Sequence, residues 1–173
     1  MKELKNHRSK IDSIDEEILR ALNKRTKVVL DIGKIKRGSN AKFYSPQRER
    51  EIINRLTSLN NGPFPNEALK TVYREILSAS LALEETLKVA CLGPVATFAH
   101  LAAMRHFGSS ASFLPLGTIR DVFEAVDTGQ ADFGVVPIEN SIEGFVSYTL
   151  DLFIDYDLKI ASEVMLEVSH NLL

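Results

Sequence analysis

The spacing of apolar residues changes character near residue 87. Before that point apolar residues recur every three or four positions, which is the pattern of amphipathic helices. Turn-forming residues cluster only at 38–46 and 60–66, and they divide this part into three predicted helices. The helices span roughly Glu3–Arg37, Pro46–Leu59 with Ser45 as N-cap, and Asn66 to about Leu87. We therefore expect an all-α domain over residues 1–87.

From residue 88 onward, short apolar or β-branched runs alternate with helical stretches. Strands are predicted at 88–93, at 112–116 and at 131–141, where the last runs into a turn. Helices are predicted at 97–108, 118–129 and 142–157, and a strand-like run covers 158–173. This alternation predicts an α/β domain over residues 88–173, with at least part of its sheet parallel. The joint between the two domains is expected at 85–88.

The first predicted helix carries cations on its apolar face. Arg8, Arg25 and Lys36 share two adjacent heptad columns with Ile11, Ile18, Leu22, Val29 and Ile32. Long side chains near helix ends can reach water, which explains Arg8 and Lys36 but hardly Arg25 in mid-helix. A buried charge costs several kcal/mol unless it is paired. The pattern predicts anions supplied by another element or by a ligand.

The other two helices bring further charged residues to their apolar sides. Arg48 and Glu49 continue that side of the second helix, and Ser80 and Glu84 lie on that of the third. Four cations against two acids predict a pocket for a small dianion, because guanidinium groups grip carboxylates through paired hydrogen bonds. The set contains no histidine, no metal-ligand spacing and no nucleophile beside a base. We expect chemistry based on shape and fixed charge, without cofactor or metal.

Composition narrows the class of protein. The chain has 173 residues, and its one cysteine, Cys91, excludes an intrachain disulfide. Because its net charge is only -2, nucleic acid is not an expected partner. Its beginning lacks the apolar core of a signal peptide, and no apolar run approaches the ~20 residues that span a membrane. We expect a cytoplasmic protein. The first helix is too long for two shorter helices to cover, which predicts a second subunit.

Three segments of the helical half resemble the all-helical chorismate mutase family. They are "RSKIDSIDEEILRALNKRTKVVLDIGKIK", "YSPQREREIINRL" and "YREILSASLALE", and the resemblance covers essentially all of residues 7–87. That family forms intertwined dimers with two sites, each completed by an arginine of the partner. The resemblance implies the rearrangement of chorismate to prephenate. It places Arg25, Arg48 and Arg8 of the partner subunit at the substrate carboxylates, Glu49 at its hydroxyl, Lys36 and Glu84 at its ether oxygen, and Ser80 near a carboxylate. Ser45 stands where many relatives have an acidic residue, and we interpret it as the helix cap.

The second half resembles the opening lobe of prephenate dehydratase. The resemblance rests on "CLGPVATFAH", "GVVPIENSIEG" and "SHNLL". In that family two α/β lobes, similar to those of periplasmic binding proteins, enclose prephenate. The resemblance implies roles for Glu139, Asn140 and Ser141, and it makes His170 and Asn171 crossover residues. Thr97 caps a helix and is also a candidate carboxylate contact.

Two further expectations concern activity. Because residues 88–173 match only one lobe, we expect this chain alone to lack dehydratase activity and feedback inhibition by phenylalanine. The alternative to an enzyme is a dimeric, non-catalytic module that binds or senses a small molecule. That alternative predicts no turnover and tolerance of Lys36→Met.

Overall fold

The computed structural model describes residues 1–39, 44–141 and 144–168. Contacts divide the chain into two units, Met1–Phe43 and Tyr44–Leu173, and each is described by itself. His170 and Asn171, predicted as crossover residues, lie outside the described residues. The predicted domain boundary between residues 87 and 88 stays a prediction.

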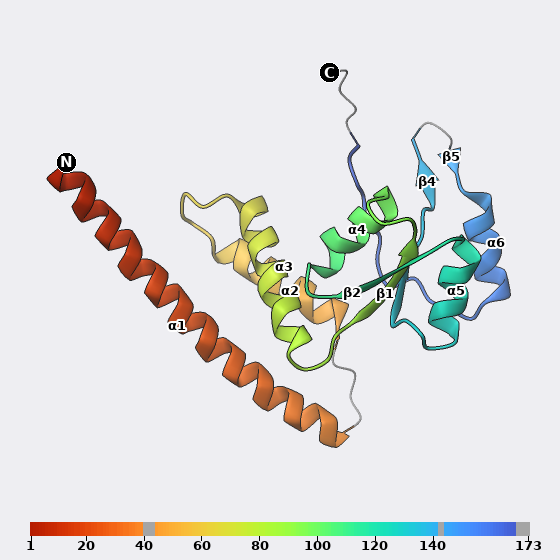
Figure 1. Ribbon diagram of the computed structural model, residues 1–173, viewed down its shortest axis with the longest axis horizontal. Helices are drawn as coiled ribbons and strands as arrows, with labels where there is room; N and C mark the ends of the chain where they lie inside the picture. The colour runs from red at the N-terminus through yellow and green to blue at the C-terminus, as the bar shows by residue number, and fades with distance from the viewer. Residues whose placement is uncertain (40–43, 142–143, 169–173) are drawn as a thin grey trace. The chain divides into compact units, whose positions relative to one another are not determined.

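The first unit is a single long helix, α1 (Lys2–Ser39) (Figure 1). It confirms the helix predicted from its apolar spacing. Two apolar side chains of its stripe, Ile11 and Ile18, are more than half exposed. A lone amphipathic helix has no second element in its own unit against which to bury such a stripe.

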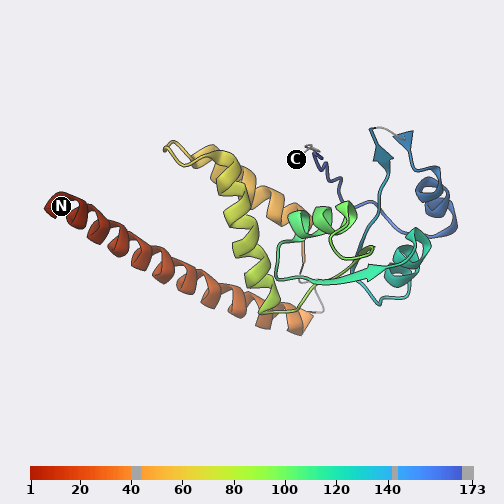
Figure 2. The same cartoon turned by 45° about the horizontal axis from the view of Figure 1, so that its top comes forward.

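The second unit begins with two helices, α2 (Pro46–Leu59) and α3 (Asn66–Ala82), which lie side by side in Figures 1 and 2. The start of α2 is as predicted: the Ser45 hydroxyl accepts the N–H of Arg48 at 3.3 Å, and Pro46 is the first helical residue. The predicted end of the third helix is wrong. The chain turns after Ala82, where the N–H groups of Glu84 and Glu85 both donate to the Leu81 carbonyl, and Leu87 enters the core beside the sheet instead.

A three-stranded parallel sheet follows, with strand order β2-β1-β3. The strands are β1 (Lys88–Leu92), β2 (Ser112–Leu116) and β3 (Phe133–Val135). Helices α4 (Phe98–Phe107) and α5 (Ile119–Asp127) cover opposite faces of the sheet. Alternate residues of β1 fix this arrangement, since Val89 and Cys91 pack against α4 whereas Ala90 packs against α5. The predicted α/β class and parallel sheet are confirmed.

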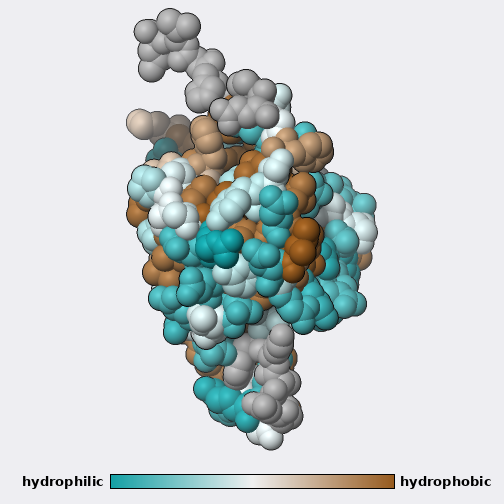
Figure 3. Space-filling model, turned by 90° about the vertical axis from the view of Figure 1, so that its right-hand side faces the viewer, coloured by the Kyte–Doolittle hydropathy of each residue, from teal (hydrophilic) through white to brown (hydrophobic). Residues whose placement is uncertain are grey.

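The last part of the chain departs most from expectation. A short hairpin pairs β4 (Glu139–Asn140), at the end of the predicted 131–141 strand, with β5 (Gly144–Phe145), which occupies the start of the predicted 142–157 helix. The helix α6 (Ser147–Asp155) begins only after it and packs against α5. Figure 3 shows this side of the molecule, where hydrophilic residues surround scattered apolar ones. Residues 157–168 form neither helix nor strand, so the predicted strand is wrong there: no neighbouring strand pairs with them.

Candidate functional site

Three of the predicted site residues belong to α1. Lys36 lies eleven residues after Arg25, close to three full turns, so both project from one side of the helix. Both are half-buried, and Arg8 is exposed. On a straight helix Arg8 lies about a quarter turn away from Arg25, because the 17 residues from one to the other make about 4.7 turns. Arg8 is therefore directed differently from the other two cations.

Arg48 is exposed at the start of α2. Its guanidinium Nη1 lies 3.1 Å from Glu51 Oε2, one turn further along the helix. This surface ion pair contributes at most about 1 kcal/mol, because both charges stay in water. Arg48 can leave Glu51 for a carboxylate ligand at little cost.

Glu49 lies in a more enclosed position than Arg48. The Tyr44 hydroxyl donates to Glu49 Oε2 at 3.2 Å. Burial raises the pKa of the Glu49 carboxyl, while the Tyr44 hydrogen bond and the charge of Arg74 act in the opposite direction. Burial and the nearby Glu49 carboxylate raise the pKa of Tyr44, so its phenol stays protonated and remains a donor.

The two predicted residues near the end of α3 differ in their setting. Ser80 is buried, and its hydroxyl donates to the Ile76 carbonyl at 2.6 Å, one turn earlier. Glu84 is half-buried in the turn that follows the helix, and not on the helix itself as predicted. Because Arg8, Arg25 and Lys36 belong to the other unit, the predicted pocket that joins both groups stays a prediction.

Thr97 acts as the predicted helix cap. Its hydroxyl oxygen accepts the N–H of His100 at 3.3 Å, and the hydroxyl donates to the Leu92 carbonyl at 2.8 Å. The cap thus ties α4 to the end of β1. Because the hydroxyl proton is already used, any contact with a carboxylate has to come from the backbone N–H groups at the start of α4, and that contact stays a prediction.

Glu139, Asn140 and Ser141 lie beyond the carboxyl end of β3. Glu139 and Asn140 form β4, Ser141 begins the turn, and all three are exposed. Glu139 pairs with Phe145, and Asn140 pairs with Gly144. The carboxyl ends of parallel strands are the usual ligand-binding edge of such sheets. The predicted motif therefore lies at the edge where a ligand is expected.

Tyr44 and Arg74 were not predicted from the sequence as site residues. Tyr44 directly precedes the Ser45 cap, and Glu49 occupies the fourth helical position, the spacing at which a residue before the cap contacts the first turn. The sequence "YSPQRE" shows this spacing. The contact is usually formed by two apolar residues, so the spacing did not indicate a hydrogen bond between Tyr44 and Glu49. Arg74 approaches only because α3 folds back beside α2.

Family models cover nearly the whole chain. Residues 7–85 match the model "Chorismate mutase type II", and residues 89–173 match "Prephenate dehydratase". The chain therefore carries one region that matches each of these two families. A protein of Aquifex aeolicus described as bifunctional chorismate mutase/prephenate dehydratase is 54% identical over 100% of this chain and 49% of its own length. The Pseudomonas aeruginosa protein of the same description is 43% identical over 99% of this chain and 48% of its own.

A solved chorismate mutase of Thermus thermophilus is also similar to part of the chain. It is 39% identical, with a TM-score of 0.47, over 47% of this chain and 93% of that one. This chain spans about half the length of the curated relatives that it matches.

Within residues 1–39, 44–141 and 144–168, no group of acidic, histidine or cysteine side chains is arranged to hold a metal ion. No helix in the same ranges has the length and apolar character to cross a membrane.

Proposed function

We propose that the chorismate mutase part, residues 1–87, catalyses the rearrangement of chorismate to prephenate on the way to aromatic amino acids. The match of residues 7–85 to the chorismate mutase family carries this proposal. The reaction breaks a C–O bond while it forms a C–C bond, and it needs neither proton transfer nor a covalent intermediate. The cation-rich residue set suits this chemistry, which depends on holding a reactive conformer and stabilising developing charge.

In this proposal each charged residue has one role. Arg25 and Arg48 bind the substrate carboxylates, Lys36 and Glu84 contact the ether oxygen, and Glu49 accepts the substrate hydroxyl. Ser80 lies near a carboxylate, and Ser45 serves as helix cap. Lys36 provides most of the stabilisation, because negative charge grows on the ether oxygen as its bond stretches.

We propose further that the protein is a cytoplasmic homodimer in which Arg8 completes the site of the partner. The exposed apolar stripe of α1 supports a second copy as the group that covers it. Arg8 is also offset from Arg25 around α1, which suits a role in the partner's pocket and not in the pocket that Arg25 and Lys36 line.

The mutase proposal is tested by the loss of chorismate absorbance. The purified chain should consume chorismate, and Lys36→Ala should slow turnover by about 10²- to 10³-fold. Lys34→Ala is the matched control: Lys34 is exposed two residues earlier and pairs with Asp31 at 2.8 Å, so its loss should leave the rate near the parent value. A folded chain that consumes no chorismate would favour a non-catalytic binding module.

For residues 88–173 we propose one lobe of a two-lobed prephenate-binding domain, with Glu139, Asn140 and Ser141 at its site. The dehydratase family match over 89–173 supports it. Prephenate binding should be measured by calorimetry in an Arg25→Ala chain, where the mutase site does not compete. Asn140→Ala should weaken binding, whereas Asn61→Ala, in the exposed loop between α2 and α3, should not. Equal affinities in both variants would reject these roles.

A further inference from the structure

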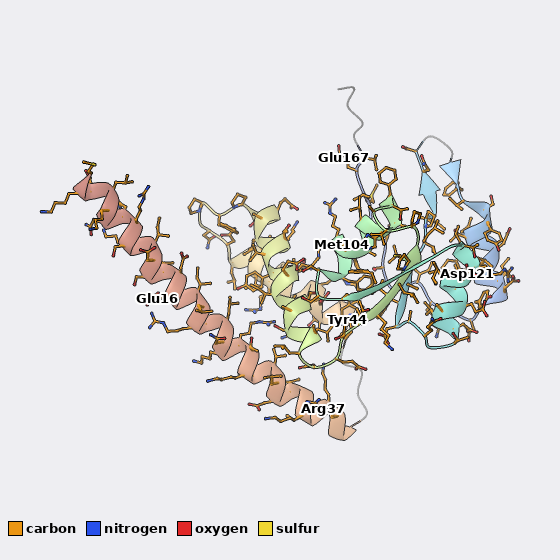
Figure 4. The ribbon with its side chains drawn as sticks, viewed as in Figure 1. Glu16, Arg37, Tyr44, Met104, Asp121 and Glu167 are labelled. Carbon is orange, nitrogen blue, oxygen red and sulfur yellow. The ribbon has the colours of Figure 1, made fainter. Side chains whose placement is uncertain are left out.

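Tyr44 connects the start of α2 with the core of the α/β part. Its ring lies 5.9 Å from that of Phe107 on α4 and 5.1 Å from that of Phe133 on β3, the latter edge to face. Its hydroxyl donates to Glu49 Oε2 at 3.2 Å. Figure 4 labels Tyr44 beside the sheet. One side chain thus links a predicted substrate contact to the sheet of the dehydratase part.

The surroundings of this pair are charged on one side and apolar on the other. The charge of Arg74 on α3 lowers the pKa of both Glu49 and Tyr44, and the charge of Arg50 on α2 lowers the pKa of Tyr44. Both arginines also lower the pKa of His106 on α4. The apolar side consists of the Phe107 and Phe133 rings. In such a partly buried place the orientation of a carboxylate is set by the few groups that can donate hydrogen bonds to it.

We propose that Tyr44 is a positioning residue for Glu49, holding its carboxylate in place through a hydroxyl whose ring is anchored in the α/β core. The inference rests on the proposed function, in which Glu49 accepts the substrate hydroxyl. A carboxylate has about four acceptor sites on its two oxygens, so the Tyr44 bond to Oε2 leaves Oε1 for the substrate. The geometry of the mutase site then depends on packing within the dehydratase part.

Tyr44→Phe removes the hydroxyl and keeps the ring packed against Phe107 and Phe133. Loss of this donor raises the pKa of the Glu49 carboxyl further, because the hydrogen bond favours its charged form. The acid limb of the kcat/KM profile for chorismate should therefore move to higher pH. A rise of one pKa unit would lower kcat/KM about tenfold on the acid side and leave the alkaline side unchanged.

Two variants make the pH profile specific for this pair. Tyr148→Phe on α6 removes a hydroxyl that accepts the Nε–H of Arg120 at 3.1 Å. The acid limb of the kcat/KM profile of this variant should match that of the parent. In a Glu49→Gln chain, where no carboxylate remains at position 49, Tyr44→Phe should no longer move the limb. Superimposed profiles of the parent and Tyr44→Phe would overturn the inference.

A second measurement separates the inference from the proposed function. Carbon-13 NMR of the labelled glutamate carboxyls, with Glu49 assigned by Glu49→Gln, follows the titration of Glu49 without any turnover. Tyr44→Phe should raise the Glu49 titration midpoint, and Tyr148→Phe should not. An inactive chain that still shows this rise would reject the mutase proposal and keep the Tyr44–Glu49 link, while an unchanged midpoint would reject the link.

Discussion

Gly108 leaves no room for a side chain beside Ser78. A Cβ atom at position 108 would overlap both Cβ and Oγ of Ser78 on α3. The next two residues are joined to the same helix, because the N–H of Ser109 donates to Glu75 Oε2 at 3.2 Å and the N–H of Ser110 donates to Ser78 Oγ at 3.3 Å. The turn that ends α4 is thereby fixed against α3, within the second unit.

Gly108→Ala should destabilise the protein for two reasons. Gly108 has φ +78 and ψ 172, a backbone region essentially confined to glycine that costs other residues about 1–3 kcal/mol, and the overlap with Ser78 adds about 1–3 kcal/mol. Gly129→Ala is the matched control, since Gly129 has φ +72 and nothing within 4 Å of the added atom. Urea unfolding at one protein concentration gives both free energies. A loss no larger for Gly108→Ala than for Gly129→Ala would contradict the packing argument.

Two inactive variants should complement each other if Arg8 completes the partner's site. Chains with Arg8→Ala and chains with Arg25→Ala are each expected to be inactive. After refolding together, each mixed dimer has one site that retains both arginines, so part of the chorismate-consuming activity should return. If mixed dimers form, as shown by mass spectrometry, and activity stays absent, each subunit builds its own site.

Glu84 gives a prediction about pH. To donate a hydrogen bond to the ether oxygen its carboxyl must be protonated, so mutase activity should fall as rising pH removes that proton. Glu84→Gln keeps a donor and cannot ionise, and it should stay active at alkaline pH where the parent loses activity. Glu85→Gln is the control, because Glu85 is exposed directly after the turn that contains Glu84. Parallel kcat/KM profiles that superimpose would exclude Glu84 from the ether oxygen.

Glu49 should show a conflict between function and stability. Burial raises the pKa of Glu49 above its value in the unfolded chain, so the folded state favours the protonated form. Stability from this group is therefore greatest below the unfolded pKa and is lost as pH rises through the folded pKa. Glu49→Gln should raise the free energy of unfolding at pH 7, with a smaller gain near pH 4, while it weakens chorismate turnover.

The control for this prediction is Glu51→Gln on the exposed side of the same helix. Glu51 pairs with Arg48 at the surface, so its replacement should change stability little at either pH. Urea unfolding of both variants and the parent at the two pH values makes the comparison. A Glu49→Gln chain no more stable than the parent at pH 7 would mean that the Tyr44 and Arg74 contacts outweigh the cost of burial.

Local sequence signals determined most helix and strand positions. Ser45 followed by Pro46 marked the start of α2, Thr97 marked that of α4, and Gly108 marked its end. These signals work because caps satisfy the backbone groups at a helix end through residues only a few positions away. The apolar run at 88–93 likewise predicted a strand, and β1 has three successive buried residues at its centre.

Signals that depend on partners far along the chain were misread or missed. The run at 158–168 has strand-like composition but forms no strand, because a strand requires an unpaired neighbour that local sequence does not specify. Glu84 was assigned to a helix face by spacing alone, yet the burial of Leu87 beside the sheet ends α3 before it. The strand β5, which pairs with β4, replaced a predicted helix start in the same way.

For the candidate site, the sequence by itself determined which residue types are present, with cations and carboxylates at helical spacing on three helices. Only the tertiary structure decided the neighbours of Glu49. Tyr44 reaches it through a local turn, but Phe107, Phe133 and Arg74 come close because the helix hairpin packs against the sheet. Hydrogen bonding and burial act over a few ångströms in space, whereas sequence spacing reports only the few residues that share one turn or strand.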